Sequence, residues 1–426
     1  MSKAGERETG AGAEGRAGAR WPVVVALFFS GWTLVYANRN VFSAVLREIG
    51  SEWGLSRTQL GLLGSLFFLA YTAGQVPAGF LADRFSRKAL LLPGFYLQGA
   101  AAIASGLARS PGAFLASRIA GGAGQSTYYA PQYALAVQHI PQNKRGFGVA
   151  AINSGMAGGV ITGLLLGSFL VYRMGLNWRV PFIVVGCLSL VAGLLIQALV
   201  PEKPGGGGPG EKPGGGGPGE QARPDQQGGP AAWRSGIKGR DFWLLWLVAL
   251  TTQYGLYLIL TWLPFYLQES RGFSGQLASA ASTLMPLAAA PSGMLVGWLS
   301  DKAGRRKKLA LWLVPLSTAA IGAIGMTRGN ALLLVGLFLY GMTGKLVLDP
   351  VLVAMVSDRV ASHARAGALG VLNLASTISM VSAPALTGYL ADVTKSFRAS
   401  FWVAIVLGVL ASVLLAFVRE EETATS

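Results

Sequence analysis

The sequence predicts an all-α membrane protein with twelve transmembrane helices in two pseudo-symmetric six-helix bundles. Composition is the first reason: 52% of the 426 residues are hydrophobic and only 13% are charged, whereas about 25% of a soluble domain is charged. Apolar stretches long enough for helices of roughly 20 residues also recur along nearly the whole chain. Finally, one short pattern occurs twice, 218 positions apart. A duplicated set of spans is typical of secondary transporters built from two bundles.

Each apolar stretch is interpreted as one membrane-spanning helix, and short turns between the stretches carry most of the charge. The expected spans, in chain order, are 22–45, 58–81, 89–108, 113–137, 146–170, 179–200, 241–267, 275–299, 309–327, 331–356, 367–390 and 398–418. In the fifth span, Gly155, Gly159, Gly163 and Gly167 recur every four residues. They therefore share one helical face, and small residues on such a face allow a neighbouring helix to approach closely.

The spans group into two domains joined by a flexible tether. Lys203 to Glu211 repeats immediately as Lys212 to Glu220, and this stretch is so rich in Gly and Pro that it can neither hold a helix nor bury a core. The expected parts are a disordered cytoplasmic tail at 1–20, an N-terminal bundle at 21–200, a cytoplasmic linker at 201–240, a C-terminal bundle at 241–418 and a cytoplasmic tail at 419–426.

The net charge of +16 follows the topology. With the N-terminus inside, the inner turns and both tails carry 23 of the 35 Lys and Arg residues, and the outer turns carry nine. This is the positive-inside bias, which predicts cytoplasmic termini and a multi-pass protein of the cell (inner) membrane. The basic excess is therefore a topology signal and does not predict a nucleic-acid partner. We expect a monomer in contact with the lipid bilayer.

The duplicated pattern begins with a glycine at the cytoplasmic end of a span and places an aspartate four residues later. The glycine should let a neighbouring helix pack tightly, and the aspartate should lie near the N-terminus of the next helix, where the helix dipole favours a carboxylate. Such a cluster is a candidate inner gate; the alternative is a pair of loops that only set topology. The candidate gating residues are Gly79, Asp83, Arg84, Arg87, Gly297, Asp301 and Arg305.

Few ionisable residues remain within the spans: Arg39, Arg118, Lys345 and Asp349. A charge at the bilayer centre costs at least ~2.5–3.5 kcal/mol, so each is a candidate functional residue. Both arginines lie nearer the outer ends of their helices, so snorkelling to the surface is an alternative. Lys345 and Asp349 are four residues apart and can neutralise each other on one helical face. Otherwise Lys345 is a second anion ligand and Asp349 a proton site.

Polar and aromatic neighbours of these charges favour a hydrated cavity over a lipid-facing surface. Arg39 is a candidate ligand for a substrate anion, since its guanidinium can hold a carboxylate by two hydrogen bonds. The candidate substrate-binding residues are Arg39, Tyr36, Asn40, Arg118, Gln125, Tyr128, Tyr129, Gln132, Tyr254, Tyr257 and Lys345.

The chain outside the tether resembles the major facilitator superfamily, whose diagnostic loops are similar to Gly79-x-x-x-Asp83-Arg84 and its repeat. Arg118-x-x-x-Gly122 is similar to the fourth-helix motif of that superfamily. More narrowly, the stretches 36–40, 54–61 and 261–274 resemble the anion:cation symporter branch, which includes sugar-acid transporters, sialin and the vesicular glutamate transporters. The resemblance implies the major facilitator fold and transport of a small organic anion held by Arg39.

Two departures from that branch bear on energy coupling. Proton-coupled members carry Asp and Glu at the positions of Asn38 and Gln125, so the resemblance does not imply simple proton symport. The stretch from Tyr254 to Leu260 also lacks the second arginine of the related organophosphate antiporters, which argues for a substrate with one negative charge. Exchange, uniport, proton coupling through Asp349 and coupling to another cation all stay open.

The sequence therefore predicts a secondary active transporter for a small organic anion, such as a monocarboxylate or sugar acid, with protons or a counter-anion as possible partners. A proton-coupled drug antiporter of the same fold is the alternative, although the fifth span lacks that group's proline. A membrane sensor belongs to a different class and would need a signalling domain, which the short tails do not offer. We expect no enzymatic activity, cofactor or metal, because no catalytic or metal-binding cluster is evident.

Overall fold

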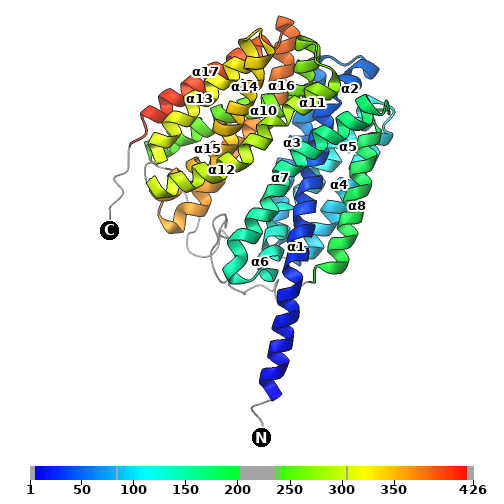
Figure 1. Ribbon diagram of the computed structural model, residues 1–426, viewed down its shortest axis with the longest axis vertical. Coiled ribbons are helices and arrows are strands. Elements are labelled where there is room, and N and C mark those ends of the chain that lie inside the picture. The colour runs from blue at the N-terminus through cyan, green and yellow to red at the C-terminus, as the bar shows by residue number, and fades with distance from the viewer. Residues whose placement is uncertain (1–4, 83–84, 202–236, 238, 304–305, 420–426) are drawn as a thin grey trace. The chain divides into compact units, whose positions relative to one another are not determined.

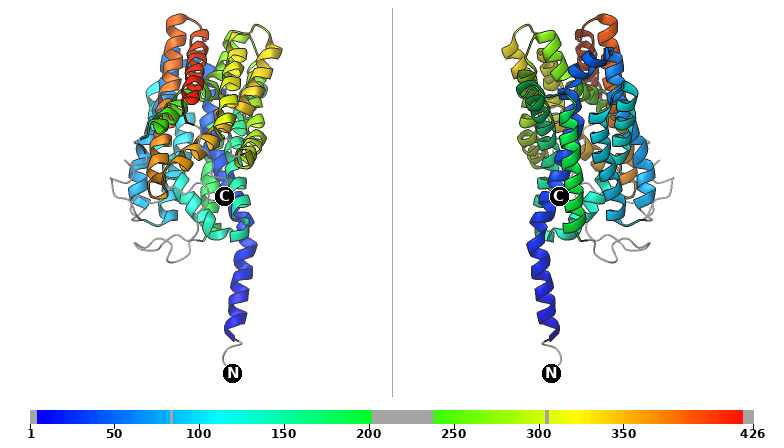
Figure 2. Two further views of the ribbon diagram at one scale, coloured as in Figure 1. Left: turned by 90° about the vertical axis from the view of Figure 1, so that its left-hand side faces the viewer. Right: turned by 90° about the vertical axis from the view of Figure 1, so that its right-hand side faces the viewer.

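The computed structural model describes residues 5–82, 85–201, 237, 239–303 and 306–419, and every regular element in these ranges is a helix. The described chain forms two compact units. In each of them the helices run roughly along one common direction (Figures 1 and 2). Most of the expected tether lies outside the described residues. An all-α membrane protein is therefore confirmed.

The first unit comprises residues 1–42 and 66–215. Its helices, or the parts of them within these ranges, are α1 (Gly5–Ala44), α3 (Arg57–Ala82), α4 (Arg87–Leu107), α5 (Pro111–Gln125), α6 (Tyr129–His139), η1 (Gln142–Lys144), α7 (Arg145–Ser168), η2 (Phe169–Arg173) and α8 (Val180–Leu199). The second unit comprises residues 43–65 and 216–426. It contains α2 (Leu46–Trp53), the first turns of α3, α10 (Arg240–Arg271), α11 (Gly275–Ser282), α12 (Leu284–Ala303), α13 (Arg306–Met326), α14 (Asn330–Thr343), α15 (Lys345–Arg359), α16 (Ser362–Thr394) and α17 (Arg398–Ala416).

The two units repeat the same helix pairings. In the first unit α4 packs against α5 and α8, and in the second unit α13 packs against α14 and α17 (Figure 1). These are the helices that an offset of 218 residues makes equivalent. The sequence duplication is therefore also a duplication of packing.

Eleven stretches of the described chain are long and apolar enough to cross a membrane. The expected fourth span, 113–137, is the exception because the structure divides it into α5 and α6, which have 15 and 11 residues. The expected tenth span, 331–356, is also interrupted, between α14 and α15. The sequence predicts both spans as continuous helices, and the structure corrects this expectation.

The two interruptions occur at equivalent positions, because α5 ends at Gln125 and α14 ends at Thr343, 218 residues further on. After Gln125 the backbone makes tight turns, with the N–H of Ser126 donating to Ala123 O at 3.3 Å. After Thr343 the backbone of Gly344 is extended, and a Cβ atom there would lie 3.0 Å from the ring of Tyr340. Glycine is required at this close approach.

The glycine face of the fifth span packs on α1. A Cβ atom on Gly155 would lie 2.5 Å from the carbonyl oxygen of Phe29, and one on Gly163 would lie 2.6 Å from that of Ala37. Real Cβ atoms do not approach backbone oxygens so closely, so only glycine allows the two backbones to meet here. The predicted packing seam is confirmed at these positions.

Candidate functional site

Arg39 lies in the last two turns of α1, and an amide holds its side chain. Its Nε donates to Oε1 of Gln125 at 2.7 Å. Gln125 is the last residue of α5, is 2% exposed, and donates from Nε2 to the carbonyl oxygen of Val35 at 3.4 Å. The interruption of the fourth span thus brings the amide to the arginine, and the amide fixes the orientation of the guanidinium.

Aromatic rings flank the same guanidinium. The Cζ atom of Arg39 lies 4.9 Å from the ring centre of Tyr36, one turn earlier on α1, and 4.7 Å from that of Tyr71 on α3. All three side chains are half-buried. A cation within about 6 Å of a ring centre is attracted by the π electrons. Tyr71 is a further candidate site residue, which the sequence does not predict because an aromatic residue within an apolar span resembles a core residue.

Arg118 lies deeper in the first unit, at 3% exposure. Its Cζ atom is 4.7 Å from the ring centre of Phe42 and 4.2 Å from that of Phe67. Its Nε has no hydrogen-bond partner among the described residues. Phe67 also contacts Arg39, whose Cζ lies 5.9 Å from the same ring centre. The two predicted cations therefore share one aromatic environment in the first unit.

Two predicted site residues, Gln132 in α6 and Tyr128 directly before it, are buried in the core of the first unit. The side chain of Gln132 is fully buried and accepts from Nε1 of Trp32 at 3.0 Å. Tyr128 is 1% exposed, and its ring meets that of Trp32 edge-on at 5.1 Å. Both side chains lie behind the surface that carries Arg39, and they hold Trp32 in place.

Tyr129 and Asn40 differ in exposure. Tyr129 is 40% exposed, and its ring centre lies 5.8 Å from Trp32 and 5.2 Å from Tyr133. Asn40 is buried and donates from Nδ2 to the carbonyl oxygen of Tyr36 at 2.8 Å, within its own helix. Tyr36 and Tyr71 flank Arg39, and the ring of Trp32 lies between that of Tyr36 and that of Tyr129, which it contacts at 5.9 and 5.8 Å.

The second unit carries tyrosines at equivalent positions. Tyr254 is equivalent to Tyr36 and is 3% exposed, with its hydroxyl 3.1 Å from Oγ1 of Thr387. Tyr257 is equivalent to Arg39 and is half-buried. An aromatic residue therefore replaces the cation of α1 at this position of α10.

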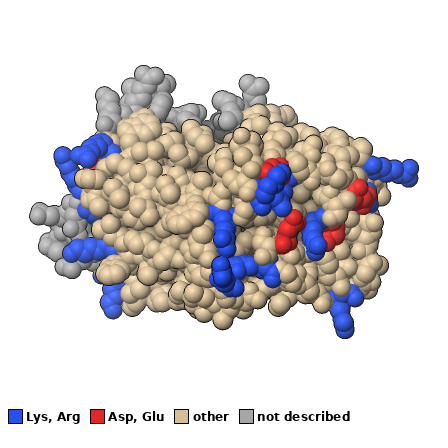
Figure 3. All heavy atoms as spheres, turned by 90° about the horizontal axis from the view of Figure 1, so that it is seen from above, with Lys and Arg blue, Asp and Glu red and all other residues tan. Residues whose placement is uncertain are grey.

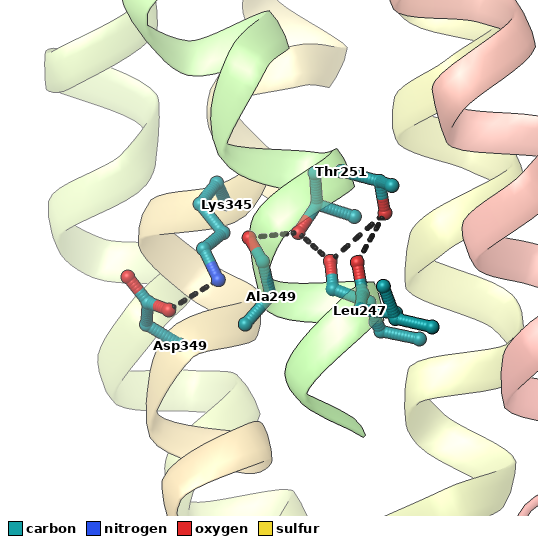
Figure 4. A network of polar contacts seen from close by, with 7 residues as sticks. Leu247, Ala249, Thr251, Lys345 and Asp349 are labelled. Atoms are coloured by element: carbon teal, nitrogen blue, oxygen red, sulfur yellow. Dashed lines mark hydrogen bonds and ion pairs between the residues drawn. The ribbon is translucent and has the colours of Figure 1, made fainter. Parts of the chain in front are cut away.

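Lys345 and Asp349 form the ion pair expected from their spacing. The Nζ of Lys345 lies 2.7 Å from Oδ1 of Asp349, and Figure 4 shows the two side chains directed at each other on α15. The side chain of Lys345 is fully buried, whereas that of Asp349 is 43% exposed. Asp349 is thus the accessible member of the pair. On neighbouring α10 the hydroxyl of Thr251 donates to Leu247 O at 2.8 Å, within its own helix.

The duplicated loops are described only in part. Asp83, Arg84 and Arg305 lie outside the described residues, and Asp301 lies within α12, where only its backbone is described. No described atom lies within 4 Å of a Cβ atom built on Gly79 or Gly297, so the expected tight helix packing at these glycines is absent among the described residues.

Basic residues near these loops bind helix carbonyls. Arg87 donates to Ala134 O of α6 at 3.2 Å, and Lys88 donates to Val200 O beyond α8 at 2.8 Å. In the second unit Lys307 donates to Ala416 O, the last residue of α17, at 3.1 Å. Lysine near a helix C-terminus satisfies carbonyls that lack a helical partner. In each unit a lysine near the start of α4 or α13 thus binds a carbonyl at the C-terminal end of α8 or α17, although Lys88 and Lys307 differ by 219 positions and are not at the same place in the repeat.

A metal centre is not indicated in the described part of the chain, where no three residues of the His, Cys, Asp and Glu types form a group that could hold a metal ion.

Residues 27–344 and 272–426 match the sequence profile of the Major Facilitator Superfamily. The chain belongs to the major facilitator superfamily. Members of the major facilitator superfamily are transporters, and the chain is accordingly a multi-pass membrane transporter and not an enzyme. The resemblance described from the sequence motifs is confirmed.

Several relatives within the major facilitator superfamily span nearly the same length. The chain is 28% identical to the hexuronate transporter of Bacillus subtilis over 420 residues, which covers 93% of this chain and 94% of that protein. It is 27% identical to the probable sulfoacetate transporter SauU of Cupriavidus necator, with 90% of each chain covered. It is 26% identical to the phosphoglycerate transporter protein of Salmonella typhimurium, with 82% of this chain and 78% of that protein covered.

Solved structures support the fold. A bacterial homolog of the human lysosomal transporter Spinster, in an inward-facing and occupied conformation, superimposes with a TM-score of 0.76 over 94% of this chain and 97% of that chain. The sequence identity is 17%. The likeness establishes the major facilitator fold.

Proposed function

We propose that this protein moves a small organic anion across the membrane by alternating access, and that Arg39 holds the negative charge of the substrate. The observation that carries the proposal is the guanidinium of Arg39, which is oriented by Gln125 and flanked by Tyr36 and Tyr71. The named substrates of the relatives, hexuronate, sulfoacetate and phosphoglycerate, are anions and support the same class.

The preferred substrate is a monocarboxylate or sugar acid. One guanidinium can bind one carboxylate by two parallel hydrogen bonds, and α10 carries Tyr257 where α1 carries Arg39. Tyr36, Tyr71 and Tyr129 present partly exposed rings, against which a sugar ring or an aromatic acid can pack. We propose a supporting role behind this surface for Gln132 and Tyr128, and a second anion contact for Arg118 or Lys345.

Exchange of anions is the proposed mode of coupling. An arginine is always charged in proteins, so an empty carrier exposes an uncompensated cation whereas an anion-loaded carrier does not. Asn38 and Gln125 are amides and cannot take up a proton at neutral pH. Asp349 is the remaining candidate proton site within the spans, and its partner Lys345 provides a competing structural explanation.

The proposed location is the cell (inner) membrane with both termini in the cytoplasm, since the inner turns hold most of the Lys and Arg residues. In this orientation the loops that contain Asp83 and Asp301 face the cytoplasm, where we propose that they stabilise a closed inner gate. We propose that the transporter is a monomer.

A thermal-shift screen of organic anions on the purified protein tests the function. A ligand present at 100 times its Kd stabilises the folded state by about 2.7 kcal/mol, which is easily measured. We expect stabilisation by hexuronates, aldonates or aromatic monocarboxylates and none by the matching neutral sugars. The Arg39→Ala variant is the control and should lose the shift. Stabilisation by hydrophobic cations, with no response to anions, would instead favour the drug antiporter.

A further inference from the structure

The start of α3 packs against α16 in the second unit, although the rest of α3 belongs to the first unit. Three successive turns make the contact. The Oγ of Ser65 accepts from the N–H of Ala385 at 3.1 Å, and one turn earlier Gly61 meets the carbonyl oxygen of Pro384 so closely that a Cβ atom would collide with it. The third turn, at the N-terminus of α3, adds charged groups.

The backbone N–H groups at this N-terminus are satisfied from two sources. Ser56 and Gln59 form a capping box, in which the N–H of Gln59 donates to Oγ of Ser56 at 3.2 Å and the N–H of Ser56 donates to Oε1 of Gln59 at 2.9 Å. The two N–H groups between Ser56 and Gln59 donate to the carboxylate of Asp392 on α16. That of Arg57 does so at 3.1 Å and that of Thr58 at 2.8 Å. The hydroxyl of Thr58 donates to the same carboxylate at 2.6 Å.

Asp392 therefore completes the cap of a helix to which it does not belong. A carboxylate at a helix N-terminus is favoured by the helix dipole, and hydrogen bonds to a charged acceptor are stronger than neutral ones. All three bonds to Asp392 would be lost together if α3 and α16 separated. The two N–H groups and the carboxylate would then need new partners, which water can supply.

The side chain of Arg57 adds a second set of bonds at the same place. Its guanidinium donates to Oε1 of Glu269, near the end of α10, at 2.8 Å and to the carbonyl oxygen of Ala391 at 3.0 Å. Figure 3 views this end of the molecule and shows basic and acidic side chains next to one another within a largely uncharged surface. Arg57 and Glu269 are partly exposed, at 22% and 38%, so water can replace their ion pair at small cost.

We propose that Asp392 and Arg57 are functional residues of the transport cycle: they hold the N-terminal end of α3 against α16 in one state and release it in the state that opens the expected extracellular side. The inference rests on alternating access, as proposed above. The hydrogen bonds of Asp392 and Arg57 fix the position of α3 on α16 while the contact is closed, and water can replace them when it opens. Such bonds suit a contact that forms and breaks in every transport cycle. Gly61 and Gly388 serve the closed state, since Gly388 lets the backbone of Arg57 approach α16.

Labelling of a buried cysteine tests this proposal without any substrate. Cys187, the single native cysteine, is replaced by alanine, and Thr261→Cys is introduced as the reporter. Thr261 is 6% exposed, and it accepts the hydroxyl of Ser43 at 2.8 Å through its backbone carbonyl, which the cysteine keeps. In right-side-out vesicles we expect Asp392→Asn to raise the rate of labelling by an externally added, membrane-impermeant maleimide about tenfold or more, the change expected from losing a charge-assisted hydrogen bond.

Asp358→Asn is the matched control, because Asp358 also pairs with an arginine in the second unit, Arg306 at 3.1 Å, but lies elsewhere on the chain. We expect its labelling rate to equal that of the parent. An unchanged rate in Asp392→Asn, or an equal increase in both variants, would overturn the proposal. Because no ligand is present, this outcome is distinguishable from a failure of the proposed anion transport.

If Asp392→Asn does not fold, a milder pair of variants at Thr58 tests the contact between α3 and α16. Thr58→Val keeps the shape of the side chain but removes the hydroxyl that donates to Asp392, whereas Thr58→Ser keeps the hydroxyl. We expect a several-fold faster labelling in Thr58→Val and the parental rate in Thr58→Ser. Equal rates in the two variants would contradict a role for this contact.

Discussion

Arg39 is oriented by an amide at its Nε, and this arrangement has a direct consequence for how the site binds charge. An amide orients the guanidinium but contributes no net charge, so Gln125 leaves the positive charge of Arg39 undiminished. A carboxylate at the same position would compete with the carboxylate of a substrate. If Arg39 binds the substrate as proposed, we therefore expect Gln125 to favour tighter binding of an anion than a carboxylate at the same position would.

Replacement of Arg39 tests the residue most directly. We expect Arg39→Ala to abolish anion-induced thermal stabilisation and uptake into liposomes while leaving expression and monodispersity intact. Arg39→Lys should also be impaired, by at least about tenfold in affinity, because an ammonium lacks the planar fork that binds a carboxylate by two hydrogen bonds. Uptake by Arg39→Ala at the parental rate would show that the side chain merely reaches to the membrane surface.

Asp349→Asn separates a structural role from a role in proton coupling. The variant leaves the fully buried ammonium of Lys345 without its counter-ion, and because water reaches Asp349 the cost should be below the about 3–5 kcal/mol of a pair in which both members are buried. We expect a lowered thermal midpoint and fast counterflow of labelled against unlabelled anion without a pH gradient. The double variant Lys345→Met, Asp349→Asn should recover the midpoint. Uptake driven by a proton gradient, and lost in Asp349→Asn, would contradict exchange.

The candidate role of a single residue could be predicted where the residue is charged within a span or lies one helical turn from a partner of opposite charge. Arg39 stands out because arginine is rare within a span, and the pairing of Lys345 with Asp349 follows from their separation by one helical turn. Tyr71 was not predictable, because its role depends on how α3 packs against α1. Tyr128 was predicted to line the site but is 1% exposed and packs between the rings of Trp32 and Phe95, contacts that the sequence around it does not show.

At the scale of helices, the glycine seam between α7 and α1 sets the distance between two backbones. We expect Gly159→Leu to destabilise the protein by about 1–3 kcal/mol, as overpacking generally does, because a side chain there collides with the backbone of Thr33. The thermal midpoint in detergent is the measurement. Gly146→Leu, near the start of the same helix, is the control, since a Cβ atom there meets no described atom within 4 Å, and its midpoint should be unchanged. Equal midpoints for both variants would refute the seam.

The spans themselves were predictable from hydropathy, but their interruptions were not. A sequence window reports length and mean composition, and neither shows where within 113–137 the helix breaks. The turn at 126–128 is formed by backbone geometry and by serine hydroxyls such as Ser126, which bonds to Ala123 O at 2.7 Å. Such local bonds leave the mean hydropathy of the window unchanged.

On the scale of the whole molecule, the duplicated loops test the inner gate. We expect Asp83→Asn or Asp301→Asn to increase labelling of an engineered cysteine from the cytoplasmic side and to slow transport more than binding, because neutral loops hold the inner side closed less well. Cysteine labelling in inside-out vesicles, with the Thr58→Ser variant as a control, is the measurement. Unchanged labelling in Asp83→Asn would remove the support for a gate.

The two-fold repetition was visible in the sequence because equivalent loops keep similar residues at a fixed offset of 218. The grouping of residues 43–65 with the second unit was not visible. This grouping depends on contacts between residues more than 300 positions apart, such as Thr58 with Asp392. The sequence around either residue does not predict that the two are in contact.

The matching interruptions at Gln125 and Thr343 have a consequence for isotope exchange. Within an unbroken span every amide hydrogen is locked in a helical bond and shielded from water by lipid. At 126–128 the N–H groups of Ser126 and Tyr128 bond only three residues back, to Ala123 O and Gln125 O, and in the other segment α14 ends and a new helix starts directly after Gly344. We expect deuterium uptake in lipid nanodiscs to be faster at 126–128 and in the first turn after Gly344 than in flanking turns, with slowing at 126–128 when an anion occupies Arg39. Uniform protection across both spans would contradict this. The protein would thus report ligand binding through its own amide hydrogens.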